Sequence, residues 1–256
     1  MKISLTLSFD HELPLGGIKE SYDQALFSPT EKVLHLAKEC NVPVTLFTDV
    51  LSGIQFQKWG DLEFSKKYET QIQSAIQMGH EVQLHLHPHW LRTSYKAGTF
   101  KPSYPDGYAL HDYKDEPYPH NIEGIVKQGI CFLNRVCKEA DPKYQCIAFR
   151  AGGYCLSPST DRILSALYEN GIRIDSSISK GYQFGSIAYL NMPRCANWYI
   201  PPTGPLTRPS QDGIFEVPIV SMPRTPWNNV PALMRRFIHR KRECQNGLSL
   251  PICLSL

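Results

Sequence analysis

The sequence has no CxxC pair, no apolar run near the length of a membrane span, no internal repeat and little net charge. Its eight cysteines are scattered through 256 residues, far more than a disulfide-stapled mini-domain has, so we expect reduced, mostly buried thiols. A bilayer span needs about 20 apolar residues, and Asp10 interrupts the N-terminal apolar pattern before a signal peptide could form. We therefore expect a cytoplasmic protein without a membrane span. A net charge of +3 gives no reason to expect a nucleic-acid partner.

The remaining pattern alternates predicted strands with predicted helices. Ile3, Leu5, Leu7 and Phe9 alternate with polar residues and predict a first strand that ends in carboxylates. Ser28-Pro29-Thr30-Glu31 predicts an N-cap and capping box at the start of a helix. Further strands are predicted at about 42–50, 144–149, 172–175 and 214–220 and in the histidine segment directly after Gly79. Further helices are predicted at about 61–78, 120–139, 157–171 and 230–242. Such alternation predicts parallel βα units, whose reactive groups gather at the ends of the strands.

Two regions break the alternation. Residues 90–119 are rich in proline, glycine and tyrosine and fit no period, so we interpret them as a long functional loop. The part after about residue 220 is irregular, and the short apolar segment 248–256 has no clear partner. With 42% hydrophobic residues and no sharp shift in composition, residues 1–256 are expected to form a single domain.

Three histidines, His85, His87 and His89, directly follow the alternating apolar run Val82-Gln83-Leu84. His85 and His89 are four residues apart and share a face in a strand or in a helix, whereas His87 joins them only if the backbone stays extended. Neutral imidazole is the commonest protein ligand for zinc. The segment therefore predicts that His85 and His89 bind a divalent metal, with zinc as the expected ion and His87 as the alternate ligand.

Asp10 and Glu12 share one face at the end of the first predicted strand. One carboxylate can bind a metal while the other acts as a base. Together with two histidines, this arrangement leaves an open coordination position for water, which is typical of a catalytic metal site. The pattern predicts a metal-dependent hydrolase.

These segments together resemble the polysaccharide deacetylases of the NodB-homology type (family 4 carbohydrate esterases). The first family motif is similar to Ser8-Phe9-Asp10-His11-Glu12, in the variant whose metal acid lies two positions after the base. The second is similar to Gly79-His80-Glu81 followed by His85 and His89. The resemblance implies that Asp10 is the base, that Glu12, His85 and His89 bind the metal, and that the fold is an irregular (β/α)7 barrel.

Two further motifs extend the resemblance to about residue 220. The segment Phe149-Arg150-Ala151-Gly152-Gly153-Tyr154 is similar to an arginine-led turn in which Arg150 would hold the base, although Gly152 replaces the usual proline. Ile174-Asp175-Ser176-Ser177 is similar to the motif whose aspartate orients that arginine. The late histidine that protonates the leaving group in the family has no counterpart after 215–219, because His239 lies in an arginine-rich helix that we interpret as solvated.

The resemblance implies removal of acetyl groups from an N-acetylated sugar or polysaccharide. Trp90, Tyr154 and Trp198 are expected to contact the substrate, because aromatic rings stack on sugars. One alternative is a hydrolase of small cyclic amides or imides from the same superfamily. Another, motivated by the missing histidine, is a sugar-binding protein without turnover.

Overall fold

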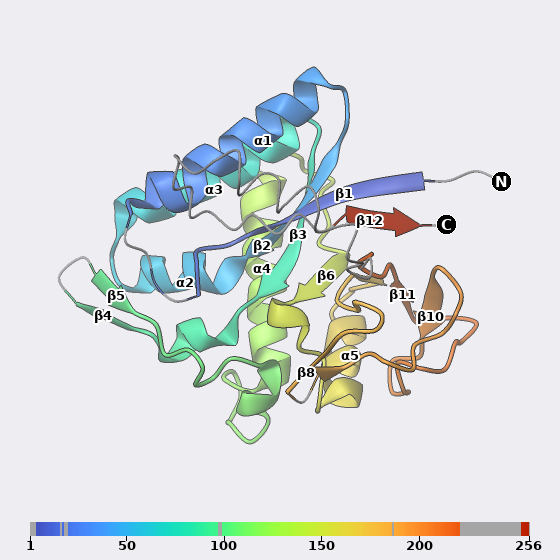
Figure 1. Ribbon diagram of the computed structural model, residues 1–256. Coiled ribbons are helices and arrows are strands. Elements are labelled where there is room, and N and C mark those ends of the chain that lie inside the picture. Colours follow the sequence, from blue (N-terminus) through green and yellow to red (C-terminus); the bar gives the residue numbers. More distant parts are fainter. Residues whose placement is uncertain are drawn as a thin grey trace, which may run out of the picture.

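The computed structural model describes residues 4–15, 17, 20–96, 99–185, 187–220 and 252–255. It is a mixed α/β structure in which most strands of the central sheet are parallel (Figure 1). The sheet strands are β1 Ser4–His11, β2 Val44–Asp49, β3 Glu81–Leu86, β6 Ala148–Ala151, β7 Ile174–Asp175, β10 Trp198–Ile200, β11 Ile214–Glu216 and β12 Ile252–Ser255. The α-helices are α1 Ser28–Glu39, α2 Val50–Lys58, α3 Leu62–Gln77, α4 Ile122–Lys138 and α5 Thr160–Glu169.

The sheet has the order β10-β11-β7-β6-β3-β2-β1-β12. The six strands from β1 to β11 in this order pair in parallel, while β10 and β12 pair antiparallel at the two edges. Within the described residues no ladder joins β10 to β12, so the sheet is not closed by strand pairing. The expected α/β class is thus confirmed. In place of the expected closed (β/α)7 barrel, the described strands form an open sheet with β10 and β12 at its edges.

The sheet is nevertheless strongly curved. Strands β6 and β1 are three positions apart, which in a flat sheet corresponds to about 14 Å. Yet the Arg150 side chain of β6 donates a hydrogen bond to Asp10 of β1, at 2.7 Å, and its guanidinium lies 4.1 Å from the centre of the Phe47 ring of β2. The strands therefore bend around a common interior, and their carboxyl ends face one another there.

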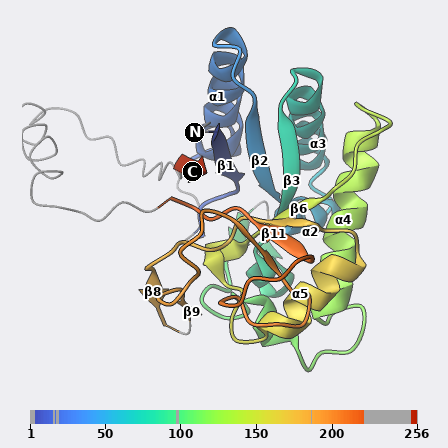
Figure 2. The same ribbon diagram turned by 90° about the vertical axis from the view of Figure 1, so that its right-hand side faces the viewer.

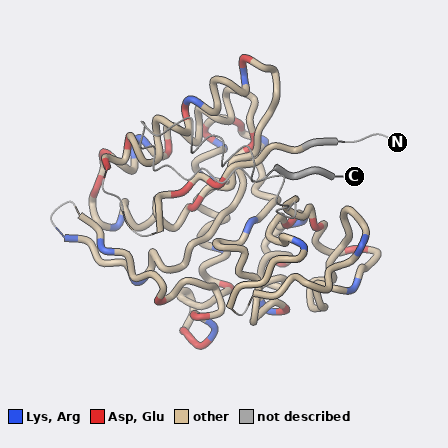
Figure 3. Tube along the Cα trace, viewed as in Figure 1, with Lys and Arg blue, Asp and Glu red and all other residues tan. Residues whose placement is uncertain are grey.

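The helices cover the outer side of the bent sheet. Helices α3 and α4 both pack against β3, and α4 also packs against α5 (Figures 1 and 2). Helix α4 buries Ile125, Leu133 and Val136, among other apolar residues, and Asn121 caps its start by accepting from the Gly124 backbone N–H at 3.0 Å. In the view of Figure 3, basic and acidic residues are interspersed along the trace. No described helix is long and apolar enough to cross a membrane.

Most predicted elements are confirmed with shifted ends, and several expectations are corrected. Ser28 does not cap α1, because the π-helix η1, Asp23–Phe27, runs directly into it and Ser28 itself has helical backbone angles. Helix α2 was not predicted. The segment expected to have no partner contains β12, which pairs with β1. The predicted helix at about 230–242, with His239, lies outside the described residues.

The predicted loop at 90–119 contains short elements. These are the 3-10 helices η2 Pro88–Arg92 and η3 Leu110–Tyr113 and the hairpin formed by β4 Ser94–Lys96 and β5 Thr99–Lys101. A second hairpin, β8 Gln183–Phe184 with β9 Ile187–Ala188, lies before β10. The short 3-10 turn η4, Gly152–Tyr154, follows β6. The six described cysteines are all free thiols, but only three of them are buried, which corrects the expectation of mostly buried thiols.

Candidate metal centre

Asp10 and Arg150 form an ion pair in the interior of the bent sheet. Arg150 is fully buried, and its Nη1 donates to Asp10 Oδ1 at 2.7 Å. Its Nη2 donates to Ser8 Oγ at 2.7 Å, one pleat earlier on the same face of β1. The Asp10 side chain keeps 23% of its surface exposed, so a small molecule can reach it. The predicted pairing of these two residues is thus present, with Ser8 as an additional partner.

Glu12, His85 and His87 bring one ligand atom each into a small volume. The three atoms lie within 4.8 Å of one another. His85 Nε2 is 3.3 Å from Glu12 Oε2 and 3.1 Å from His87 Nε2, and Glu12 Oε2 also contacts His87 Nε2. Both imidazoles are buried, while the Glu12 side chain is 28% exposed. A carboxylate oxygen and two imidazole nitrogens are a common ligand set for catalytic zinc.

The hydrogen bonds of these histidines fit a bound cation. His85 Nδ1 lies 2.8 Å from the Arg150 carbonyl oxygen, which can only accept, so Nδ1 carries the proton and Nε2 presents a lone pair to the group. Such a backbone partner is typical of a metal-binding histidine. Without a cation, the lone pair of His85 would face the Glu12 carboxylate, and only a hydrogen on His87 Nε2 would be available to it as a donor. The donor set therefore fits a divalent metal.

The electrostatics of the group point the same way. Burial alone would raise the pKa of Glu12, but the His87 and His85 imidazoles hold it well below its usual range. Burial alone would lower the pKa of His87, but the Glu12 carboxylate raises it to about 9. The cluster of acceptors thus attracts positive charge, which either a proton or a metal ion can supply.

His89 lies beside this group but outside it. The backbone remains extended through His87, with φ −110° and ψ 90°, and then turns into η2 at Pro88. Extended residues two apart share a face, so His85 and His87 point together while His89 is carried away by the turn. The rings of His87 and His89 are 5.5 Å apart, and neither ring nitrogen of His89 has a hydrogen-bond partner among the described residues. The geometry therefore favours the predicted alternate, His87, as the third ligand.

Asp49, which the sequence analysis missed, positions the histidine segment. It ends β2, and its Oδ1 accepts from the His87 backbone N–H at 3.1 Å while its Oδ2 accepts from Trp90 Nε1 at 2.6 Å. Burial raises the pKa of Asp49 to about 6. The carboxylate at the end of an apolar strand next to the histidine strand was the available signal.

Asp175 supports Arg150 indirectly, through the turn that follows β7. It accepts from the Ser177 hydroxyl at 2.7 Å and from the Ser177 backbone N–H at 3.2 Å. Ser176 contacts the arginine directly, because its carbonyl oxygen accepts from Arg150 Nε and its hydroxyl from Nη2, both at 3.0 Å. Asp175 therefore orders the turn that presents Ser176. Glu216, also missed, is buried next to Asp175 in the β7–β11 register.

The predicted aromatic contacts separate into two kinds. Trp90 and Trp198 are 1% and 3% exposed, and the indole of Trp198 donates to the Leu206 carbonyl at 3.0 Å. Their rings are core residues with no face left for a sugar. Tyr154 is half-buried and close enough to Asp10 and Arg150 for their charges to influence its pKa. Its φ of 64° is unusual for a residue other than glycine. Tyr154 is therefore the predicted aromatic residue that the structure brings next to the ion pair.

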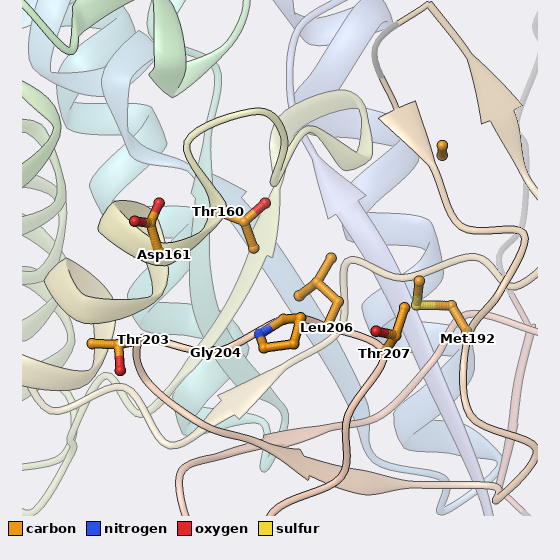
Figure 4. A pocket seen from close by; sticks show the side chains of 9 residues that line it. Thr160, Asp161, Met192, Thr203, Gly204, Leu206 and Thr207 are labelled. Carbon is orange, nitrogen blue, oxygen red and sulfur yellow. The ribbon is translucent and has the colours of Figure 1, made fainter.

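An open pocket of about 390 Å³ is lined by other residues, from the start of α5 and from 203–207 (Figure 4). Thr160 and Asp161 lie on one side of it and Leu206 on another. It shares no residue with the Glu12, His85 and His87 group. Asp161 is the one ionisable side chain that lines this pocket, so the lining residues do not form a metal site or an acid–base pair.

No family model and no curated protein sequence matches this chain. Two solved structures are similar to it. One is the Xyl-CE4 domain of a multidomain xylanase from the hindgut metagenome of Trinervitermes trinervoides, with 14% identity, a TM-score of 0.33 and coverage of 64% of this chain and 52% of that chain. The other is a family 4 carbohydrate esterase from Streptomyces lividans in complex with acetate, with 13% identity, a TM-score of 0.36 and coverage of 67% and 60%. The matched part thus spans about half to three fifths of each.

Proposed function

We propose that the chain is a metal-dependent hydrolase that removes acyl groups, acetyl above all, from N- or O-acylated sugars. The observation that carries the proposal is the convergence of Glu12, His85 and His87 beside the Asp10 carboxylate that Arg150 holds. The sequence motifs that resemble polysaccharide deacetylases support the acyl sugar as substrate.

A divalent cation held by Glu12, His85 and His87 would lower the pKa of a water molecule and polarise the acyl carbonyl. Asp10 precedes Glu12 by two residues at the carboxyl end of β1, so its carboxylate borders the same space. It is partly exposed, and we assign it the role of accepting a proton from the attacking water. Arg150 fixes the orientation of this carboxylate and shields it from the core.

The surrounding residues keep this arrangement rigid. Arg150 is held at Ser8 and Ser176 as well as at Asp10, so its guanidinium cannot swing toward the ligand group. His85 is held at the Arg150 carbonyl, and the His87 backbone is held at Asp49. One network therefore fixes both the base and two of the ligands, as a hydrolytic site requires.

The test is acetate release from N-acetylglucosamine oligomers and from acetylated xylan. The purified chain is assayed with added zinc, after chelation and after zinc is restored. We expect activity that chelation abolishes and zinc restores, and we expect Asp10→Asn to lower kcat by about 10²- to 10⁴-fold, the usual contribution of a general base. The surface variant Asp23→Asn is the matched control. Full activity after chelation, or in Asp10→Asn, contradicts the proposal, and so does turnover of cyclic imides without turnover of acetylated sugars.

A further inference from the structure

The loop between η2 and η3 is tied to the histidine segment at several points. The Tyr113 hydroxyl donates to the Pro88 carbonyl at 2.8 Å, and the Ser103 hydroxyl donates to the His89 carbonyl at 2.8 Å. Arg92 bridges to Asp106 at 2.8 Å. Residues 103–113 are therefore held in a fixed position relative to the ligand group.

This loop places Tyr108 beside His87. Its ring centre is 5.9 Å from that of His87. Its hydroxyl occupies the space beside Gly153, where a Cβ would fall 1.4 Å from the hydroxyl oxygen. At Gly152 a Cβ would likewise fall 2.7 Å from His87 Nδ1. The two glycines thus allow the histidine and the tyrosine to approach the same turn.

The Tyr108 hydroxyl makes no hydrogen bond with any described residue. In contrast, the hydroxyls of the buried tyrosines Tyr68, Tyr113 and Tyr144 each donate to a backbone carbonyl. Burial, followed by the nearby Cys155, raises the pKa of Tyr108, so the phenol keeps its proton at neutral pH. It is a neutral hydrogen-bond donor with no partner inside the described protein.

Expulsion of an amine or alcohol from a tetrahedral intermediate needs such a donor at the leaving atom. Among the charged side chains of the site, Asp10 and Glu12 accept, and the Arg150 guanidinium is held by Asp10, Ser8 and Ser176. Tyr154 interacts electrostatically with Asp10 and Arg150 and therefore lies near the proposed base. Tyr108 lies beside His87, and its hydroxyl lies against Gly153 in the turn that follows the strand of Arg150.

We propose that the Tyr108 hydroxyl donates a hydrogen bond to the leaving atom of the scissile acyl bond. The inference rests on the proposed hydrolase function. In the reaction the water oxygen bonds to the carbonyl carbon, the carbon–nitrogen or carbon–oxygen bond breaks, and the proton accepted by Asp10 is returned to the leaving group. Tyr108 keeps its own proton throughout and acts by stabilising charge on the departing atom.

The test compares Tyr108→Phe with Tyr104→Phe on two substrates. Tyr104 is in the same loop, its ring packs edge-on against Tyr108 at 5.1 Å and it is 45% exposed, so it is a matched control. The substrates are an N-acetylglucosamine oligomer, whose amine is a poor leaving group, and 4-nitrophenyl acetate, whose phenolate leaves unaided. We expect Tyr108→Phe to lower kcat about 10²-fold on the oligomer and by no more than about threefold on the aryl ester, with Tyr104→Phe unchanged on both.

Further measurements separate this role from folding and metal binding. Zinc affinity, measured by competition with a chromophoric chelator, and urea unfolding should be the same in Tyr108→Phe and wild type. Across aryl acetates of graded phenol acidity, the rate of the variant should depend more steeply on the leaving group than the wild-type rate does. Equal losses on both substrates, or no loss on either, would overturn the role of Tyr108 while leaving the hydrolase intact. If wild type hydrolyses neither substrate with zinc, the proposed function itself fails.

Discussion

His11 lies between the two carboxylates Asp10 and Glu12 and points to the opposite side of β1, into the core. Its Nε2 is 3.0 Å from Gln71 Oε1, and its ring stacks on Tyr68 with centres 5.3 Å apart. Burial lowers the pKa of His11 from 6.5 to about 4, although the hydrogen bond with Gln71 and the Glu12 charge act in the opposite direction. The folded protein therefore requires this histidine to be neutral.

The sign of the effect on stability follows from the lowered pKa. Above pH 6.5 the histidine is neutral in both the folded and the unfolded chain, so its contribution is fully present. As the pH falls from 6.5 toward 4, the unfolded chain binds a proton that the folded chain does not, and the free energy of unfolding decreases. Linkage arithmetic gives a loss of about 2 kcal/mol between about pH 8 and about pH 5.

The assay is urea unfolding of wild type and His11→Gln at both pH values, with chelator present throughout. Glutamine can keep a hydrogen bond to Gln71 but does not titrate, so the difference in unfolding free energy between the two pH values should shrink by about 2 kcal/mol. The control is His35→Gln, whose side chain is 60% exposed and hydrated in both states. The reasoning is refuted if wild type and His11→Gln lose the same free energy on acidification.

The remaining predictions concern the support of the site. Arg150→Lys should lower the free energy of unfolding by about 3–5 kcal/mol, because one ammonium group cannot replace the guanidinium donors of a buried pair. Urea unfolding measures this loss. As a control, Arg135→Lys at an exposed position should lower the free energy of unfolding by less than about 1 kcal/mol. Gly152→Ala should weaken zinc binding about 10- to 100-fold, because the new Cβ would lie 2.4 Å from the Leu86 carbonyl oxygen and would displace His87. Zinc affinity is measured by competition with a chelator. Unchanged affinity would show that the position of His87 does not depend on this glycine.

Much of the site was accessible from the sequence because parallel strands bring their ends together. The apolar alternation before Asp10 and before His85 placed both residues at strand ends, and the motif before Tyr154 placed Arg150 on a third strand. The structure pairs Asp10 with Arg150 as the motifs imply. These positions depend on the local sequence alone, so they could be predicted without knowing the tertiary structure.

The choice between His87 and His89 depended on where the strand ends. Spacing alone allows His85 to share a face with either residue, and the decision lies in the backbone angles of His87 and in the turn that begins at Pro88. A turn of this kind is set by the loop that packs around it. The ligand set was therefore open at the level of sequence, and it remains a proposal that metal binding must test.

Residues that act across several strands were out of reach. Ser8 meets Arg150 because the sheet bends, Ser176 meets it through the pairing of β6 with β7, and Asp49 supports His87 through the pairing of β2 with β3. The sequence pattern reports which face a side chain occupies but not the curvature of the sheet. For the same reason the rings of Trp90 and Trp198 could not be recognised as core residues.

The most direct test of the central claim is anomalous diffraction from a zinc-soaked crystal. The account predicts a peak within about 2.0–2.2 Å of a Glu12 carboxylate oxygen and of His85 and His87 Nε2, with Asp10 next to it and not coordinated. A peak coordinated by His89 in place of His87 would contradict the proposed ligand set. The absence of zinc at Glu12 and His85 would contradict the proposed metal centre as a whole.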